Sequence, residues 1–447
     1  MLVRSVSGVR GIVGDGLSPE TARAYARAFG TRGGGIVVGQ DARSNGLWLA
    51  QAVLAGLADA GARPAYLGLV ATPAVQVAVE EMGAAGGFIV TASHNPDGWN
   101  GFKFVGADGT FLAPEEMEAL FAAVDAAAPP AAAADAPSCA FEPGAVGLHV
   151  RRCLAGTGLV GGALAAARLR VVVDGCRSVG GLSTVRALRE AGCEAVELDC
   201  EPDGRFTRGL EPLPENLGAL GARVRETRAH FGVAHDPDGD RAALVDEKGE
   251  PLGEERTLAL AVREELARRP GPVVVNLSTS AASEDLARAA GVPFHRSRVG
   301  ERHVVGRMRE VGAGIGGEGN GGVILPAAHW GRDGTVAALI TARAVAQARE
   351  PLSGLAATLP AYEMRKEKIE GVRWPEARER VRAAFPDAAA DDTDGWRFAW
   401  SGEWIHVRPS GTEPVVRVIA EAPTAERALE LCARAREALA KSGSDRR

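Results

Sequence analysis

This 447-residue sequence has few long hydrophobic runs, few lysines and no closely spaced cysteine pair. No uninterrupted apolar stretch approaches the roughly 18 residues that span a bilayer, so we expect no membrane-spanning segment. Residues 1–5 lead into glycine-rich sequence without an apolar signal core, so we expect a cytoplasmic protein. The six cysteines form no C-x-x-C pair, which argues against a cysteine-based metal or redox centre and favours buried free thiols.

The basic residues are nearly all arginine, because only five of the 51 are lysine. The net charge is −6 and no basic tract resembles a nucleic-acid footprint, so no nucleic-acid partner is expected. Apolar residues make up 46% and charged residues 24%, as in an ordinary globular protein. A compact domain holds about 100–200 residues. The length therefore predicts three or four domains.

The first third of the chain alternates short buried strands with helical patterns. The predicted elements are a helix starting at Ser18 and Pro19, a strand at 36–38, a helix near 47–57 and a strand at 87–90. This alternation favours an α/β layer structure with much parallel pairing. Ligands of such sheets gather at the loops after the strands. The polar turn at residues 91–97 is therefore a candidate site.

Composition and periodicity divide the chain into four predicted domains. A helix predicted from Pro114 is followed by alanine- and proline-rich residues 125–137, which are typical of a linker. Later units begin near a strand at 169–174, near residue 249 and after Pro360, and an amphipathic helix closes the chain. The predicted domains are residues 1–137, 138–248, 249–359 and 360–447.

The first polar segment, T-A-S-H-N-P at residues 91–96, places Ser93 on a loop after a buried strand. A serine hydroxyl there could be a nucleophile if it is activated. His94 and Lys103 are nearby candidates for acid–base work. The residue types alone favour an ordinary surface turn. Lys103 shifts the balance, because it is the only lysine before Lys248 and lysine can give up a proton near neutral pH.

The second segment, D-P-D-G-D-R, carries Asp236, Asp238 and Asp240 at alternating positions. Three carboxylates that face one side of a loop suit a hard cation such as Mg²⁺ or Ca²⁺. An EF-hand is excluded, because Arg241 stands where that loop needs glycine and residues 242–245 continue as a strand. A solvated acidic turn is disfavoured, because close like charges repel unless a cation offsets them.

Two more segments could bind a sugar and a phosphate. In G-G-E-G-N-G-G at residues 316–322, Glu318 and Asn320 could hydrogen-bond hydroxyls, although a flexible loop fits the glycines equally well. In R-P-S-G-T-E-P at residues 408–414, followed by Arg417, arginines, hydroxyls and backbone N–H groups could cradle a phosphate. A turn with an Arg–Glu pair is the alternative there.

In this order the four segments closely resemble the α-D-phosphohexomutase family of phosphoglucomutases, phosphomannomutases and phosphoglucosamine mutases. Further matches are S-G-V-R-G at 7–11, V-G-Q-D-A-R at 38–43, P-D-G-R-F at 202–206 and E-P-L-P-E-N-L at 211–217. The resemblance covers residues from about 5 to about 420. It implies an α/β protein of four domains around a central cleft, three of similar mixed α/β type and a smaller C-terminal α+β domain.

The resemblance also implies how the reaction proceeds and which residues act. A phosphorylated Ser93 would exchange its phosphoryl group with a hexose phosphate through a hexose 1,6-bisphosphate. Mg²⁺ would be held by a phosphoserine oxygen of Ser93 and by Asp236, Asp238 and Asp240. Arg10, His94 and Lys103 would handle protons or steady the transferred group. The implied substrate contacts are Arg241, Arg302, His303, Glu318, Asn320, Arg408, Ser410, Gly411, Thr412 and Arg417, although His303 could equally be a core or interdomain residue.

The sequence departs from the family pattern in the sugar loop. Many members carry G-E-x-S-G-H, whereas Asn320 and Gly322 replace the serine and the histidine here. We expect a phosphoglucosamine mutase, with a phosphomannomutase/phosphoglucomutase of dual specificity as the alternative. A sugar-phosphate-binding protein without turnover and a phosphatase that uses Ser93 are the remaining hypotheses. The expected partner is a small hexose phosphate, and the expected state is a monomer or homodimer.

Overall fold

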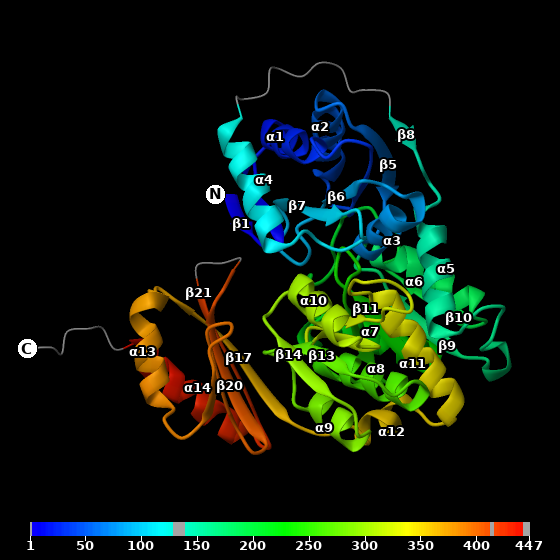
Figure 1. The fold of residues 1–447 in the computed structure, drawn as a ribbon. Coiled ribbons are helices and arrows are strands. Elements are labelled where there is room, and N and C mark those ends of the chain that lie inside the picture. Colours follow the sequence, from blue (N-terminus) through cyan, green and yellow to red (C-terminus); the bar gives the residue numbers. More distant parts are fainter. Residues whose placement is uncertain (1, 128–138, 412–414, 441–447) are drawn as a thin grey trace, which may run out of the picture.

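The computed structural model describes residues 2–127, 139–411 and 415–440, which form four sheets with flanking helices (Figure 1). The four units follow one another around a central region, the first at the top of the view and the fourth at the lower left (Figure 1). Three units are mixed α/β and the smaller fourth has an antiparallel sheet, which confirms the predicted fold class. None of the helices in the described ranges is long and apolar enough to cross a membrane.

The first unit is an eight-stranded sheet with helices on both faces. Its strands are β1 (Leu2–Ser5), β2 (Gly8–Val13), β3 (Gly16–Leu17), β4 (Gly35–Gln40), β5 (Arg63–Leu69), β6 (Gly86–Val90), β7 (Trp99–Gly106) and β8 (Ala140–Phe141). The main path runs β1-β2-β7-β6-β4-β5-β8, with β3 beside β2. The central β4 pairs in parallel with β5 and β6. The predicted strands at 36–38 and 87–90 are thus confirmed as β4 and β6.

The helices of this unit are α1 (Pro19–Gly30), α2 (Gly46–Asp59), α3 (Thr72–Met82) and α4 (Pro114–Ala126). Apolar side chains of α1, α2 and α4 form one core on the sheet, and those of α3 form another. The helix predicted from Ser18 is confirmed, because the Ser18 hydroxyl accepts the Thr21 N–H at 3.3 Å and Pro19 opens α1.

The predicted linker starts slightly too early. Helix α4 continues through Asp125 and Ala126, where Asp125 accepts two hydrogen bonds of 2.7 Å from the Arg4 guanidinium. This bidentate pair ties the last turn to β1, a long-range contact that local composition does not reveal. Residues 128–137 of the predicted linker lie outside the described residues. Beyond them, β8 returns to the first sheet and pairs with β5.

The second and third units share one topology. The second contains β9 (Arg170–Asp174), β10 (Glu194–Leu198), β11 (Phe231–His235) and β12 (Ala242–Val245) in the order β10-β9-β11-β12. The third contains β13 (Val273–Asn276), β14 (Phe294–Ser297), β15 (Ile315–Glu318) and β16 (Gly322–Ile324) in the order β14-β13-β15-β16. In each sheet only the last strand of that order is antiparallel. A polar motif therefore occupies the same hairpin of both units.

The helices of these units are α5 (Ala145–Thr157), α6 (Gly180–Glu190), α7 (Gly218–Thr227), α8 (Glu254–Arg268), α9 (Ala282–Ala289), α10 (Glu301–Val311), α11 (Gly334–Ala348) and α12 (Leu352–Ala357), with short 3₁₀ turns at Ala165–Ala167 and Pro214–Asn216. One hydrophobic core continues from α5 of the second unit to α11 and α12 of the third. Because apolar burial is continuous across this boundary, the two units should act as one stable body.

The fourth unit is an antiparallel sheet covered on one face by two helices. Its strands are β17 (Glu363–Glu370), β18 (Ala389–Asp391), β19 (Trp396–Trp400), β20 (Glu403–Pro409) and β21 (Val415–Ala422), in the order β17-β21-β20-β19-β18. The helices α13 (Trp374–Ala384) and α14 (Ala425–Ala440) pack against it in a separate core. The predicted C-terminal amphipathic helix is confirmed as α14.

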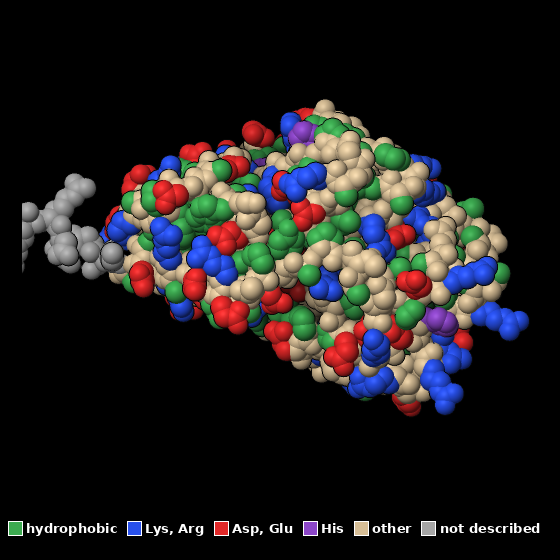
Figure 2. All heavy atoms as spheres, turned by 90° about the horizontal axis from the view of Figure 1, so that it is seen from below, with side chains coloured by type: hydrophobic (Ala, Val, Ile, Leu, Met, Phe, Trp, Pro, Cys, Tyr) green, Lys and Arg blue, Asp and Glu red, His purple; other side chains and the backbone are tan. Residues whose placement is uncertain are grey.

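The cysteines and the charged side chains are placed as the composition predicts. All six cysteines are free thiols, of which Cys139 and Cys200 are half-buried and the other four are buried. Acidic and basic side chains are interspersed over the described part of the face drawn in Figure 2. Such mixing is ordinary for a globular surface.

A buried polar cluster fastens α5 to the start of α11. Asp333 caps α11, and its Oδ1 accepts the Thr335 N–H at 2.7 Å. Its Oδ2 accepts from His149 Nε2 at 2.7 Å, from His329 Nε2 at 3.0 Å and from Cys153 Sγ at 3.2 Å. Burial opposes ionisation, but His149 and these hydrogen bonds outweigh it and hold the Asp333 pKa well below its usual range. The carboxylate is thus the centre of the interface between the two units.

Replacing Asp333 with alanine should destabilise this joint body by about 3–5 kcal/mol, because buried donors and a helix N-terminus lose their acceptor together. The free energy of unfolding from urea titration would measure the loss. As a control, Asp392→Ala removes a carboxylate from an exposed ion pair with Arg378, which should cost less than about 1 kcal/mol. Equal effects of the two substitutions would contradict the assigned role of Asp333.

Candidate functional site

The four predicted polar segments meet at one cavity of about 430 Å³ between the units. Its lining includes the expected residues Arg10, His94, Lys103, Arg241, Arg302, His303, Glu318, Asn320, Arg408, Ser410, Gly411 and Arg417. Ser93 and the three aspartates lie directly behind Lys103 and His94. Thr412 lies outside the described residues. A larger cavity of about 1110 Å³ near Arg343 is lined by other residues, none of which belongs to the four motifs.

The loop after β6 holds Ser93 in a left-handed conformation with φ of 51°. A non-glycine residue pays about 1–3 kcal/mol for this, so its neighbours must fix it. Arg43 donates to the carbonyl oxygens of Ser93 at 2.7 Å and Asn95 at 2.6 Å. Thr91 Oγ1 accepts the Ser93 N–H at 2.9 Å and donates to Asp41 at 2.6 Å. The V-G-Q-D-A-R segment thus serves as the support of the serine loop.

The Ser93 hydroxyl lies between an acid and an imidazole. Its Oγ donates to Asp236 Oδ2 at 3.2 Å and lies 3.2 Å from His94 Nδ1. Burial, together with the positive charges of Arg241 and Arg10, holds the His94 pKa well below its usual range. The imidazole is therefore neutral at pH 7.

The hairpin between β11 and β12 gathers three buried carboxylates. Ligand oxygens of Asp236, Asp238 and Asp240 lie within 4.8 Å of one another. Asp238 Oδ1 and Asp240 Oδ1 are buried and find no hydrogen-bond donor among the described residues. Burial and the two neighbouring carboxylates raise the Asp236 pKa well above its usual range. Buried acceptor oxygens without donors fit a hard divalent cation, so these residues could hold Mg²⁺.

Two cations counter this charge from the cavity side. Lys103 Nζ lies 2.6 Å from Asp238 Oδ2 and 3.1 Å from Asp240 Oδ2. Burial opposes its charge, but the two aspartates outweigh burial and raise the Lys103 pKa. Arg332 Nη2 donates to Asp240 Oδ2 at 2.6 Å. Although burial favours the neutral acid, Arg332 and Lys103 hold the Asp240 pKa below its usual range.

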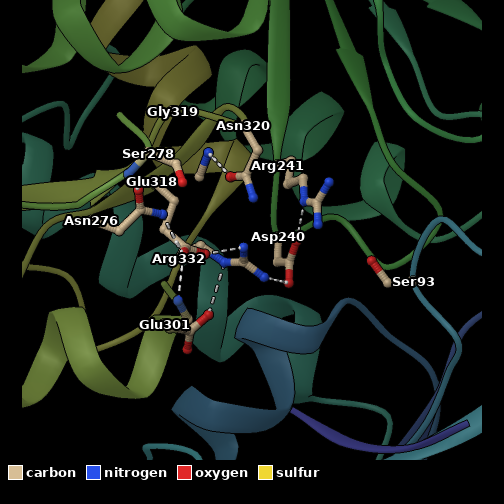
Figure 3. Close-up of polar contacts among 12 residues, drawn as sticks. Ser93, Asp240, Arg241, Asn276, Ser278, Glu301, Glu318, Gly319, Asn320 and Arg332 are labelled. Atoms are coloured by element: carbon tan, nitrogen blue, oxygen red, sulfur yellow. Dashed lines mark hydrogen bonds and ion pairs between the residues drawn. The ribbon is translucent and has the colours of Figure 1, made fainter. Parts of the chain in front are cut away.

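The sugar loop presents Glu318 at the end of β15 (Figure 3). Glu318 Oε1 accepts from Asn276 Nδ2 and from the Gly300 N–H, both at 2.8 Å. Its Oε2 accepts from Arg332 Nη1 at 2.6 Å. Asn320 Oδ1 accepts the Gly322 N–H at 3.3 Å, and the Asn320 side chain lines the cavity. A carboxylate fixed at both oxygens can still accept sugar hydroxyls through its remaining lone pairs.

Two further predicted residues line the cavity at the start of α10. Arg302 Nη1 donates to Thr110 Oγ1 of the first unit at 2.5 Å. His303 is half-buried, and burial lowers its pKa. It lines the cavity, which lies between the units, so its role in sugar binding stays a prediction.

The fourth unit contributes basic side chains from two paired strands. Arg408 of β20 lies opposite Arg417 of β21 in the antiparallel register, and both line the cavity. Arg408 Nε donates to Asp394 Oδ2 at 3.1 Å, and the same oxygen accepts the Val299 N–H at 3.0 Å. Asp394 therefore connects the basic strand pair with the third unit. Two guanidinium groups beside Ser410 and Gly411 suit a phosphate.

Sequence reasoning assigns no role to Asn276 or Arg332, which the structure places in the site. Asn276 ends the buried strand β13, so the rule that ligands gather after strands could have found it. Arg332 lies in a loop just before α11, and its sequence surroundings carry no comparable signal. Its importance follows only from the three carboxylates around it (Figure 3).

Comparisons with known proteins match this arrangement along nearly the whole chain. Models of the phosphoglucomutase/phosphomannomutase alpha/beta/alpha domains I, II and III match residues 2–130, 158–249 and 254–362. The model of the phosphoglucomutase/phosphomannomutase C-terminal domain matches residues 363–438.

Individual relatives agree with these matches. A Methanopyrus kandleri protein named "Probable phosphoglucosamine mutase" is 37% identical over 435 residues, and the alignment covers 95% of each chain. A "Phosphoglucomutase/phosphomannomutase" of Thermococcus kodakarensis is 34% identical over 440 residues, again with 95% of each chain covered. The crystal structure of a phosphoglucomutase/phosphomannomutase family protein from Burkholderia thailandensis superposes with a TM-score of 0.83 at 28% identity. That superposition covers 97% of this chain and 96% of the other.

Proposed function

We propose that this chain, which belongs to the phosphoglucomutase/phosphomannomutase family, works through a phosphorylated Ser93. It is a phosphohexomutase, an isomerase of sugar phosphates. The observation that carries this proposal is the Ser93 hydroxyl, held 3.2 Å from both Asp236 and His94 behind a cavity lined by Glu318 and Arg408. A nucleophile, an acid–base group, hydroxyl acceptors and a phosphate anchor then share one site.

The proposed reaction has two phosphoryl transfers. The Oγ–P bond of phosphorylated Ser93 breaks while a free hydroxyl oxygen of the hexose monophosphate bonds to phosphorus. The hydroxyl proton passes to the site, and a proton ends on Ser93 Oγ. The resulting hexose 1,6-bisphosphate reverses its orientation, and its other phosphoryl group returns to Ser93. The sugar oxygen freed in this second transfer takes the proton, so the net change is an isomerisation.

Two side chains are poised to exchange those protons. His94 is neutral, so one of its two ring nitrogens is unprotonated and can accept a proton, whereas Lys103 is charged and can donate one at Nζ. A reversible transfer needs both an acceptor and a donor. Arg10, which donates to Asn95 Oδ1 at 2.6 Å, adds positive charge beside the transferred group.

We propose Mg²⁺ as the cofactor, held by Asp236, Asp238, Asp240 and an oxygen of the phosphorylated serine. The buried oxygens of Asp238 and Asp240 that lack donors support this assignment. When bound there, the ion would offset charge on the transferred phosphoryl group.

We propose glucosamine phosphate as the substrate. The name of the Methanopyrus kandleri relative supports it, and so does a pair of glutamates on the cavity wall, which also carries arginines and lysines. Glu254 and Glu255 at the start of α8 share the single ammonium of Lys366, at 2.9 Å and 3.3 Å. A Cβ on Gly319 would lie 1.9 Å from Glu255 Oε2, so the carboxylate lies directly against the sugar loop. Burial raises the pKa of Glu255 to about 7, and the ammonium of an amino sugar would favour the charged form of this carboxylate.

The test is a product assay with Mg²⁺ and catalytic hexose 1,6-bisphosphate. We expect kcat/KM for glucosamine 6-phosphate to exceed those for mannose 1-phosphate and glucose 1-phosphate by about tenfold or more, the equivalent of one charge-assisted contact. Glu255→Gln, which removes charge but keeps shape, should reduce this preference and leave turnover of the neutral sugars similar. Comparable rates on mannose and glucose phosphates would instead identify a dual-specificity enzyme. Absence of turnover on all three would favour a sugar-phosphate-binding protein.

A further inference from the structure

Position 322 of the sugar loop is glycine, and the space that a side chain would take there is occupied by Arg332. A Cβ on Gly322 would lie 2.3 Å from Arg332 Cδ and 3.0 Å from Arg332 Cγ. The Arg332 side chain cannot easily move aside, because it is buried and bonded at three nitrogens. A residue larger than glycine at position 322 would therefore clash with the present conformation of the Arg332 side chain. Arg332 fills the space that a loop side chain would otherwise need.

The Arg332 guanidinium connects three buried carboxylates of different segments (Figure 3). Nη2 donates to Asp240 Oδ2 at 2.6 Å, and Nη1 donates to Glu318 Oε2 at 2.6 Å. Nε donates to Glu301 Oε2 at 3.1 Å. Gln76 of α3 in turn donates to Glu301 Oε1 at 2.9 Å, so the network extends into the first unit.

These bonds determine which carboxylate oxygens remain for ligands. Asp240 uses Oδ2 for Arg332 and Lys103, while its Oδ1 has no donor among the described residues. Glu318 is held at Oε2 by Arg332 and at Oε1 by Asn276. A guanidinium is a rigid planar fork, so a shift of either carboxylate is transmitted to the other. A cation bound to Asp240 would weaken the ion pair between Asp240 and Arg332. The ion pair between Arg332 and Glu318 would then become stronger.

We propose that Arg332 is a positioning residue that couples the cation site at Asp240 to the sugar site at Glu318. Because coupling is reciprocal, bound hexose phosphate raises cation affinity by the same factor that the cation raises sugar affinity. This inference rests on the proposed function, since it takes Asp240 as a cation ligand and Glu318 as a sugar contact. Without Arg332, each ligand still finds its own residues, but neither affects the other.

The experiment measures binding in the Ser93→Ala background, where phosphoryl transfer is blocked. Mn²⁺ is titrated by electron paramagnetic resonance with and without saturating glucosamine 6-phosphate. We expect the sugar phosphate to tighten Mn²⁺ binding by about fivefold or more. Arg332→Gln should still bind Mn²⁺, but the ratio of the two dissociation constants should fall to about one. Arg332→Lys, which keeps the charge without the fork, should restore only part of the ratio.

Two further variants keep the test decisive. Arg309→Gln removes an exposed cation of α10, paired with Asp108, and should leave the ratio unchanged. Gly322→Ala keeps the arginine but displaces its side chain, so it should also reduce the ratio if Arg332→Gln fails to fold. An unchanged ratio in Arg332→Gln or in Gly322→Ala would overturn the coupling. Mn²⁺ and sugar phosphate that bind independently in the Ser93→Ala parent would also overturn it, whereas absence of any sugar-phosphate binding would overturn the proposed function as well.

Discussion

Replacing Ser93 with alanine is expected to lower the kcat for hexose phosphate isomerisation by about 10⁴-fold or more, as for removal of other enzymatic nucleophiles. The neighbouring hydroxyl of Thr91 cannot substitute, because it already donates to Asp41 and accepts from the Ser93 N–H. Alanine keeps the left-handed backbone and loses only the hydroxyl, so the fold should persist. The measurement is the initial rate of product formation with Mg²⁺ and hexose 1,6-bisphosphate.

The control for this variant is Ser44→Ala. Ser44 lies exposed in the same unit, shortly after β4, and its loss should leave kcat within about twofold, as for surface substitutions away from the site. Melting temperatures of both variants would verify folding. If Ser93→Ala retained most of its turnover, phosphoryl transfer would have to pass through another group.

Asp238→Asn should raise the Mg²⁺ concentration for half-maximal activity by at least about tenfold. Asp238 offers a buried oxygen without a donor, and its other oxygen is already fixed by Lys103 and by Thr72 at 2.7 Å. An amide at this position removes one negative charge, and its neutral oxygen is a weaker ligand for a hard cation. Activity titrated against Mg²⁺ would measure the shift, and direct Mn²⁺ binding would separate affinity from turnover.

The matched control is Glu215→Gln, which removes an exposed carboxylate from the same unit. It should leave the Mg²⁺ dependence unchanged, because surface charges of this kind are screened by solvent. An unaltered metal requirement in Asp238→Asn would place the cation elsewhere.

The regular elements could be predicted because their signals are local. The Ser18 cap, the apolar strand at 87–90 and the amphipathic spacing of residues 425–439 each lie within a few residues of the structure they specify. The end of α4 could not be predicted, because the contact that extends it comes from Arg4. The continuous core between the second and third units was equally hidden, since it depends on which helices face each other.

The site could be predicted as four motifs but not as one network. Each motif follows a strand or occupies a hairpin of its own sheet, and the packing of the four units brings the motifs to one cavity. The roles proposed for individual residues remain predictions. Gly322 appeared in the sequence as the loss of a side chain, whereas the structure fills that space with Arg332 from a later segment. Such a replacement of one side chain by another from a distant segment depends on packing, so no local pattern in the sequence predicts it.

The most direct test of the central claim is a transfer experiment with enzyme labelled by ³²P on Ser93. The labelled protein is mixed with unlabelled glucosamine 6-phosphate and Mg²⁺ for a single turnover, and the label is followed by chromatography. The account predicts that the label leaves Ser93 on a sugar bisphosphate and then appears in hexose phosphates, with little inorganic phosphate. Release of the label as inorganic phosphate would indicate a phosphatase, and label that stays on the protein would contradict turnover through Ser93.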